Sequence, residues 1–423
     1  METRTNVLWQ RSYRSLALTA QTYKRSPMAA QPNSSIATNG VEMKFAHLAD
    51  LHIGKRLYEY SLVENQKDIL NKIVELVKAN CVDGVVISGD IYDKSVPPVD
   101  AVEIMDDFLS ALSSLEIFII IIGGNHDSVA RLSFASKILE KNNVYISPVF
   151  SGNVEKIEMT DNFGRINFYL LPYIRPVNVR RAYEDFEGET FTEALKFVMD
   201  KINPDTSIRN VLVSHQFVTG AQKSDSEEIY VGGSENVAYT LFDDFDYVAL
   251  GHLHMPQAVG RETVRYAGTP LKYSFSEISH KKSMTIVDIR EKGKVEIEVI
   301  PLIPAQDLVE LKGSLKELIN ESVVASVECN SFVKITLTDE VLKNDALDVL
   351  KQFYPYIVSI GYDNSMTRQN NVVQSRAVSE EQRPEEIVEE LFVQQNNRQM
   401  NDVERGLIEK LVKKVWEREY ETD

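Results

Sequence analysis

The sequence predicts an α/β fold in which helices cover both faces of a central sheet. From Lys44 to about Ser283, short apolar runs rich in β-branched residues alternate with amphipathic helical segments. Five of the runs are followed directly by a polar cluster, and these clusters contain five of the seven histidines. Strands joined through helices lie parallel, so their carboxyl ends would meet at one edge of one sheet. Ligands of α/β proteins bind at that edge, and we expect the functional site there.

The apolar runs have the length and composition of buried strands. Strands are expected at residues 45–49, 85–87, 117–122, 211–213 and 247–250. The segments 62–79 and 98–115 place their apolar residues on one helical face. Strands alternating with such helices predict βαβ units.

The polar clusters supply the ligand types of a two-metal site. They occupy residues 50–52, 89–90, 124–127, 214–215 and 251–254. Carboxylate, imidazole and amide oxygen together suit manganese, iron or zinc, so we predict a site for two hydrated divalent cations. Such a pair activates a water near neutral pH and holds the oxygens of a phosphate ester. The predicted chemistry is therefore phosphoester hydrolysis.

One ligand must touch both cations, and Asp90 is the natural bridge because it is the lone acid of its cluster. His252 and His254 are two residues apart on extended backbone and point the same way, so each can serve a different ion. The remaining ligands divide into two sets, which are Asp50, His52 and His254 for one ion and Asn125, His215 and His252 for the other.

His126 is the fifth clustered histidine, and Asp127 follows it directly. An imidazole oriented by a neighbouring carboxylate suits proton donation to a leaving oxygen, so we assign His126 and Asp127 a catalytic role. A ligand role for His126 stays open. Asp93 is expected to support a metal ligand without binding the metal itself. Each residue alone has an ordinary structural explanation, but their joint occurrence after strands favours a functional site.

A second module follows the first domain, which spans residues 43–283. A hairpin signal at 284–300 opens a small α+β module over residues 284–363. Residues 364–382 are polar without an apolar period and predict a linker. The segment 383–423 predicts two amphipathic helices, which either bind a partner protein or pack back onto their own domain.

The N-terminal segment, the apolar stretches and the cysteines indicate which class of protein this is. Residues 1–42 are basic, rich in polar residues and without a sustained period, so we expect a leader outside the fold; the composition can also resemble an organellar transit peptide. The longest apolar stretch, 117–122, is far too short to cross a bilayer. Cys81 and Cys329 lie in apolar sequence and do not predict a disulfide framework, which favours the cytoplasm.

A formal net charge of −17 argues, taken alone, against a nucleic-acid partner. Two divalent cations would offset four of the carboxylates, so the argument is weak for a metal enzyme. Any DNA affinity would then come from the metals and from local basic groups. The candidates for such contacts are Lys55, Arg56, Arg131, Arg175, Arg180, Arg181, Lys272, Lys281 and Lys282.

The clusters resemble the motifs of the calcineurin-like metallophosphoesterase superfamily, which read D-x-H, G-D-x-x-D, G-N-H-D, H and G-H-x-H. They occur here at residues 50–52, 89–93, 124–127, 215 and 251–254. Within the superfamily, residues 47–54, 88–93, 123–127 and 266–271 resemble the SbcD family of double-strand-break repair nucleases. Ala267 and Thr269 differ from the residues that the family usually has in the last segment. The difference concerns phosphate contacts and not the metal site.

The resemblance implies a four-layer β-sandwich flanked by helices, with a small α+β capping domain and a C-terminal helical pair. It also implies a manganese-dependent nuclease acting as an exonuclease on duplex DNA ends and as an endonuclease on hairpins and single strands. The implied partners are DNA, a second copy through the nuclease domain, and an SbcC-type coiled-coil ATPase that binds the helical pair. A nucleoid-associated, cytoplasmic enzyme is expected.

Two other functions compete with this interpretation. A phosphatase or small-molecule phosphodiesterase could use the same scaffold, although Ser/Thr phosphatases carry Arg-Gly after the second acid, where this chain has Lys94 and Ser95. A scaffold with a decayed metal site could merely recruit the ATPase. The presence of every expected ligand argues against decay.

Overall fold

The computed structural model describes residues 36–37, 42–224, 227, 237–341, 345–365, 388–389, 392, 398–401, 403–408 and 410–411. The expected leader falls almost entirely outside the described residues, as do most of the expected linker and helical pair. No helix in the described part is long and apolar enough to cross a membrane. Cys81 and Cys329 are both exposed and free.

A six-stranded sheet carries the first three polar clusters. Its strand order is β15-β14-β2-β5-β6-β7. The strands are β2 (Met43–Leu48), β5 (Gly84–Ser88), β6 (Phe118–Ile122), β7 (Val144–Ile146), β14 (Ser283–Ile289) and β15 (Val295–Pro301). β2, β5, β6 and β7 run parallel, so the carboxyl ends of β2, β5 and β6 lie at the same edge.

A seven-stranded sheet carries the other two clusters. Its order is β1-β8-β9-β10-β11-β13-β12. The strands are β1 (Ile36–Ala37), β8 (Glu155–Asp161), β9 (Gly164–Leu171), β10 (Arg209–His215), β11 (Tyr247–Gly251), β12 (Gln257–Val259) and β13 (Arg261–Tyr266). The clusters therefore come from two sheets, and the single sheet that we expected is wrong.

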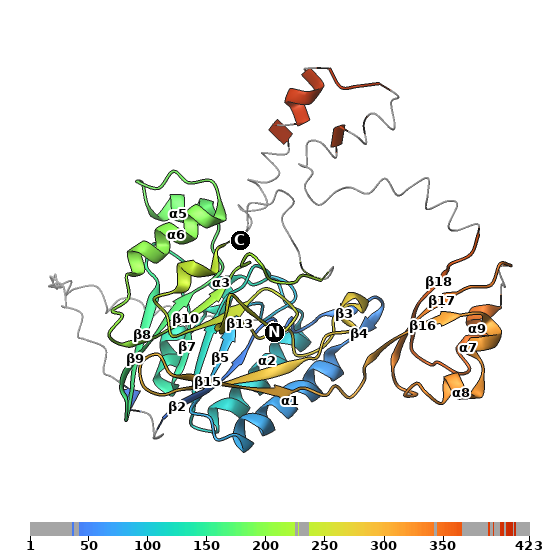
Figure 1. The fold of residues 1–423 in the computed structure, drawn as a ribbon, viewed down its shortest axis with the longest axis horizontal. Helices are drawn as coiled ribbons and strands as arrows, with labels where there is room; N and C mark the ends of the chain where they lie inside the picture. The colour runs from blue at the N-terminus through green and yellow to red at the C-terminus, as the bar shows by residue number, and fades with distance from the viewer. Residues whose placement is uncertain are drawn as a thin grey trace, which may run out of the picture. The chain divides into compact units, whose positions relative to one another are not determined.

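The two sheets pack face to face with helices outside them. Phe45 and Ile120 of the first sheet share one buried cluster with Phe168 and Val213 of the second. The helices α1 (Val63–Ala79) and α2 (Val99–Ser113) cover the outer face of the six-stranded sheet, and α5 (Pro176–Ala182) and α6 (Phe191–Ile202) cover that of the seven-stranded sheet (Figure 1). This order of layers is the helix-flanked sandwich that we expected.

The outer helices form where the sequence has the signals for them. The predicted stripe of α1 buries Ile69, Ile73 and Val77, which are four residues apart on one face. α6 begins with a capping box, in which the Thr190 hydroxyl accepts from the Glu193 amide at 3.2 Å. The remaining short elements are β3 (Arg56–Leu57), β4 (Tyr60–Ser61), α3 (Val129–Leu132), α4 (Ser136–Leu139), η1 (Glu140–Asn142), η2 (Tyr239–Phe242) and η3 (Phe275–Glu277).

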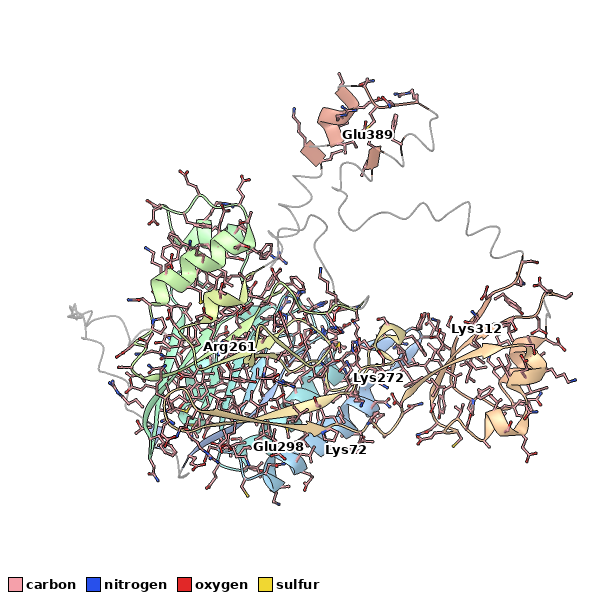
Figure 2. All side chains as sticks on the ribbon, in the orientation of Figure 1. Lys72, Arg261, Lys272, Glu298, Lys312 and Glu389 are labelled. Carbon is pink, nitrogen blue, oxygen red and sulfur yellow. The ribbon has the colours of Figure 1, made fainter. Side chains whose placement is uncertain are left out.

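The small module has its own sheet and core. Its elements are β16 (Leu308–Gly313), α7 (Leu315–Leu318), α8 (Glu321–Val324), β17 (Phe332–Leu337), α9 (Ala346–Leu350) and β18 (Ile357–Tyr362). Its three strands are parallel, and the core lies between them and the helices. The Tyr60 ring lies 5.5 Å from the Phe332 ring, and Lys272 (labelled in Figure 2) pairs with Asp307 at 2.9 Å.

The boundary that we expected at residue 284 is wrong. β14 and β15 form the predicted hairpin, but β14 also pairs with β2 along residues 43–47. The hairpin therefore completes the six-stranded sheet, and the small module starts after it, near β16. The hairpin signal was local, whereas the choice of pairing partner depends on β2, more than 200 residues away.

Candidate metal centre

Hydrogen bonds between loops join the clusters of both sheets. The amide of Asp50 donates to the Gly89 carbonyl at 3.0 Å, and the amide of His52 donates to the Asp90 carbonyl at 3.0 Å. Across the sandwich, the amide of His252 donates to Asp50 Oδ1 at 2.9 Å. The ends of β2, β5 and β11 are thereby held together although they belong to different sheets.

Two glycines allow the loops to approach this closely. A Cβ atom on Gly124 would lie 2.1 Å from Asp90 Oδ1, and one on Gly89 would lie 2.3 Å from His215 Nδ1. Gly89 also has a positive φ of 89°. Asp50, His52 and Asp90 also have positive φ angles. Residues other than glycine rarely adopt this conformation, so the backbone is strained at the site.

Asp90 lies at the centre of the cluster. Its Oδ2 is 3.3 Å from His215 Nε2, 3.7 Å from His52 Nε2 and 3.9 Å from His126 Nε2. Its Oδ1 accepts from the His126 amide at 2.9 Å. A carboxylate that lies within 4 Å of three histidines suits a ligand shared between two cations.

Asn125 joins the histidines of the seven-stranded sheet. Its Oδ1 lies 3.0 Å from His215 Nε2 and 3.0 Å from His252 Nδ1. The other nitrogen of His215, Nδ1, donates to the Ser88 carbonyl at 2.7 Å. That bond holds the ring so that Nε2 faces Asn125 and Asp90.

The structure divides the ligand atoms differently from the sequence prediction. Among the described histidines, cysteines and acids, two groups have ligand atoms within 4.8 Å of one another: His52, Asp90 and His126, and Asp50, Asp90 and His215. Asp90 belongs to both. Asp50 therefore lies with His215, although we assigned them to different ions, and His126 lies within ligand reach of the first group. His254 is close to His52, with ring centroids 5.1 Å apart, but joins neither group.

The residues present fit divalent cations. Asp50 Oδ2 and both ring nitrogens of His52 are buried and have no hydrogen-bond partner among the described residues. Unpaired buried polar atoms cost free energy unless a ligand satisfies them. Cations held by the two groups would satisfy these atoms, the His52 nitrogen in one group and the Asp50 oxygen in the other.

Burial and mutual charge set the protonation states of the site. Burial raises the pKa of Asp50, and the neighbouring Asp90 carboxylate raises it further. Burial opposes the charged form of His215, but the carboxylates of Asp90 and Asp50 raise its pKa to about 9. Burial and the charge on His215 lower the pKa of His252 to about 3. A pair of divalent cations would compensate the negative charge of the buried carboxylates and would accept the lone pairs of neutral imidazoles.

The Asp127 carboxylate binds backbone amides of two loops. Its Oδ2 accepts from the amides of Ile91 and Gly124 at 3.0 and 2.9 Å, and its Oδ1 accepts from the amide of Tyr92 at 3.0 Å. The carboxylate thus organises the loops after β5 and β6. The catalytic role that we assigned to it with His126 stays a prediction.

A backbone carbonyl contacts the His126 ring. Its Nδ1 lies 3.1 Å from the Asp93 carbonyl oxygen, which places Nε2 on the side of Asp90. The Asp93 side chain lies 2.7 Å from Lys55 Nζ and 4.0 Å from His52 Nδ1. Asp93 therefore lies beside two site histidines, and its supporting role stays a prediction.

Sequence reasoning missed the residues that hold His254. Its Nδ1 lies 2.9 Å from Glu277 Oε1, and Lys282 Nζ lies 2.6 Å from Glu277 Oε2 and 2.6 Å from Thr269 Oγ1. Lys282 is buried, so its expected DNA contact is wrong. No local pattern identifies Glu277, because it lies 23 residues after His254.

Gln66 was missed as well, although a signal for it exists. It is a polar residue on the buried face of α1, and it is 1% exposed. Its Nε2 donates to the His52 carbonyl at 2.7 Å, and its Oε1 accepts from the Gly54 amide at 2.9 Å. A polar residue within an apolar stripe is the feature that could have identified it.

The comparison with known families agrees with this centre. The family model of the calcineurin-like phosphoesterases matches residues 43–256, which include every predicted ligand. The chain belongs to the calcineurin-like phosphoesterase family. This phosphoesterase is a metal-dependent phosphodiesterase, and the cations it uses are divalent. A second model, described as the type 5 capsule protein repressor C-terminal domain and named for SbcD, matches residues 304–396 and thus the small module.

The relatives of this phosphoesterase include a curated protein from Staphylococcus epidermidis that is named as the D component of the nuclease SbcCD. It is 30% identical over 384 residues, which are 89% of this chain and 100% of the relative. A solved dimetal phosphatase from Danio rerio is 13% identical and covers 62% of this chain, with a TM-score of 0.36 and 100% of its own chain aligned. A solved protein from Thermus thermophilus is 11% identical and covers 61% of this chain and 99% of its own, with a TM-score of 0.37.

Proposed function

We propose that this chain is the DNA nuclease component of an SbcCD-type complex, with exonuclease activity on duplex ends and endonuclease activity on hairpins and single strands. The observation that carries the proposal is Asp90, which two groups of possible ligands share at the joined ends of both sheets. Similarity to an SbcCD nuclease component over 89% of the chain supports DNA as the substrate. The setting would be the cytoplasm, at the nucleoid, in DNA end processing for repair and recombination.

The proposed ligands are Asp50, His52, Asp90, Asn125, His215, His252 and His254. Their mixture of imidazole, carboxylate and amide oxygen suits manganese, iron or zinc, and we propose Mn²⁺ because the resemblance to the SbcD family implies it. When bound, two such cations lower the pKa of a water molecule and polarise the phosphodiester. His126 would donate a proton to the leaving oxygen, since the Asp93 carbonyl holds its Nδ1 and leaves Nε2 on the side of Asp90.

The proposed protein partner is an SbcC-type coiled-coil ATPase bound by the C-terminal segment. Residues 403–408 are helical. Val403, Leu407 and Leu411 are spaced by four residues, and all three are exposed. An apolar stripe on the outside of a helix supports docking into a groove of another protein.

A homodimer through the nuclease domain is the second proposed contact. The residues around the start of α2 and along α3 and α4 expose a group of large apolar side chains, namely Val96, Val99, Val102, Phe134 and Ile138. Arg131 Nη1 donates to the Ser95 carbonyl at 2.7 Å and ties these two segments together. A patch of this kind favours an interface with a second copy, so that the complex would hold two nuclease chains.

The test is digestion of end-labelled hairpin and linear duplex DNA in Mn²⁺, with and without an SbcC-type ATPase. A generic phosphomonoester serves as the parallel substrate. We expect metal-dependent cleavage of DNA that the ATPase stimulates. Hydrolysis of the monoester without DNA cleavage under any condition would refute the nuclease and favour a phosphatase.

A further inference from the structure

A histidine outside the metal centre lies buried between the two sheets. His47 is in the middle of the six-stranded sheet, where β2 pairs with β5 on one side and with β14 on the other. The sheet face around it is apolar, with Phe45 two residues before it and Val86 opposite it on β5. An imidazole buried in such surroundings costs free energy unless its nitrogens are hydrogen-bonded. The partners of His47 therefore indicate what the residue does.

His47 connects a strand of each sheet through its two ring nitrogens. Its Nδ1 lies 2.9 Å from the Tyr247 hydroxyl, at the start of β11 in the seven-stranded sheet. Its Nε2 lies 3.1 Å from Ser88 Oγ, at the end of β5 in the six-stranded sheet. A hydroxyl can donate or accept, so both bonds form with either neutral tautomer of the ring. The imidazole thus ties the end of β5 to β11.

Ser88 is the residue through which the end of β5 contacts the metal centre. Its carbonyl accepts from His215 Nδ1 at 2.7 Å, while His215 Nε2 lies 3.3 Å from Asp90 Oδ2. A Cβ on Gly251 would lie 1.9 Å from the same carbonyl oxygen. The Ser88 carbonyl therefore lies against the ends of both β10 and β11. A rotation of this residue would move the acceptor that orients the His215 ring.

The chain needs an anchor at this point because it leaves the strand through a glycine. Gly89 follows Ser88 and has a positive φ of 89°. Glycine restricts the backbone least of all residues, so contacts must fix the peptides on either side of it. The Gly89 carbonyl accepts from the Asp50 amide at 3.0 Å. The residue before Gly89 is anchored by the hydrogen bond between the Ser88 hydroxyl and His47.

We propose that His47 is a positioning residue for the metal ligand His215. The His47 imidazole fixes the Ser88 side chain, the Ser88 carbonyl holds the Nδ1–H of His215, and Nε2 is left as the atom that binds a cation. A hydrogen bond of this kind sets both the tautomer and the direction of a ligand histidine. The inference rests on the proposed ligand role of His215, and it holds whether the substrate is DNA or another phosphodiester.

Two replacements of His47 separate positioning from packing. The amide of Asn reaches the place of Nδ1, so His47→Asn keeps a partner for the Tyr247 hydroxyl and loses the bond to Ser88. The amide of Gln reaches the place of Nε2, so His47→Gln keeps the bond to Ser88. Ser88→Ala removes the same bond from its other side. If packing alone mattered, the two His47 variants would affect the metal centre equally.

The measurements are calorimetric titration of Mn²⁺ and the visible spectrum of bound Co²⁺, which follows ligand geometry. We expect Ser88→Ala and His47→Asn to weaken the binding of one cation by about tenfold, the lower end of the usual effect behind a histidine ligand. Both should shift the Co²⁺ bands in the same way. His47→Gln should bind Mn²⁺ within about threefold of the wild type and keep its Co²⁺ spectrum.

Thr285→Val is the matched control for the loss of a buried hydroxyl. Thr285 pairs with His47 across β14 and β2, it is fully buried, and its Oγ1 has no hydrogen-bond partner among the described residues. This variant should keep the wild-type affinity and spectrum. Urea unfolding of every variant records stability separately. Wild-type metal binding in Ser88→Ala and His47→Asn, or an equal change in Thr285→Val, would overturn the positioning.

His215→Ala tests the ligand assignment on which the inference rests. Loss of one cation in His215→Ala, with the expected changes in Ser88→Ala and His47→Asn, would support the positioning. The same loss with wild-type metal binding in the other two variants would refute the positioning and leave the proposed ligand in place. Two cations retained in His215→Ala would refute the ligand and, with it, its positioning by His47.

Discussion

Nδ1 of His254 lies 2.9 Å from Oε1 of Glu277, and both side chains are buried. The carboxylate stays ionised in spite of burial, because hydrogen bonding to His254 and the charge of Lys282 hold the pKa of Glu277 well below its usual range. An imidazole whose Nδ1 faces a carboxylate offers Nε2 to a metal.

We expect Glu277→Gln to weaken metal binding by about 10- to 100-fold, the usual effect of losing a carboxylate behind a histidine ligand. The measurement is calorimetric titration of Mn²⁺ or the visible spectrum of bound Co²⁺. The control is Glu298→Gln on β15, because Glu298 is exposed and remote from the centre. Unchanged affinity in Glu277→Gln would mean that the pair serves packing alone.

His126 and Asp90 should separate turnover from metal binding. Asp90→Asn should lose both cations, because Asp90 belongs to both ligand groups. His126→Asn should abolish turnover and still retain two cations per chain, as counted by metal analysis after gel filtration. Equal loss of metal in both variants would make His126 a ligand.

Gly124 should tolerate no side chain. In Gly124→Ala the new Cβ would lie 2.1 Å from Asp90 Oδ1, a distance that forces the central carboxylate to move. We expect metal affinity and turnover to fall by at least about tenfold, since ligand geometry sets both. Gly361→Ala on β18 is the control, because a Cβ there meets nothing within 4 Å. Wild-type metal binding in Gly124→Ala would contradict the close approach.

Asp127 should stabilise the folded protein, because its carboxylate binds the loops after β5 and β6. Asp127→Asn places an amide N–H₂ where the carboxylate now accepts backbone donors, so at least one of three hydrogen bonds is lost. We expect the free energy of unfolding to fall by about 1–3 kcal/mol in urea denaturation. Asp107→Asn on the exposed face of α2 should change it little. A fully stable, inactive Asp127→Asn enzyme would instead support the catalytic role predicted from sequence.

His47 should make the protein acid-sensitive. It is buried between the Tyr247 hydroxyl at 2.9 Å and Ser88 Oγ at 3.1 Å, and burial, together with the charge of Arg265, lowers its pKa to about 3. The unfolded state, with a pKa near 6.5, then binds more protons between pH 6.5 and about 3. Stability from this group is present above pH 6.5 and is lost as the pH falls, by up to about 1.4 kcal/mol per pH unit.

The variant His47→Asn isolates this contribution. Urea unfolding at pH 7, 6 and 5 in the presence of a chelator measures the slope of stability against pH for both proteins. Other buried histidines titrate equally in the two, so the difference between slopes belongs to His47. Identical slopes would show that His47 is not the acid-sensitive group.

The sequence by itself predicted the residues that lie at the centre and the chemistry they support. Each cluster follows a β-branched run, and this local pattern sufficed to place Asp50, Asp90 and His252 at strand ends. The amphipathic period likewise predicted α1 and α2. These signals are local, because the side chains that face a core recur with the period of their own element.

Only the tertiary structure decided which elements and side chains meet. Because β14 pairs with β2, the hairpin belongs to the first domain. Because the two sheets pack together, His252 of one sheet contacts Asp50 of the other. Glu277 reaches His254 through a chain reversal that no short motif marks. Strand pairing, burial and ion pairing depend on partners distant in sequence, so their free energies are set by the folded core and not by neighbouring residues.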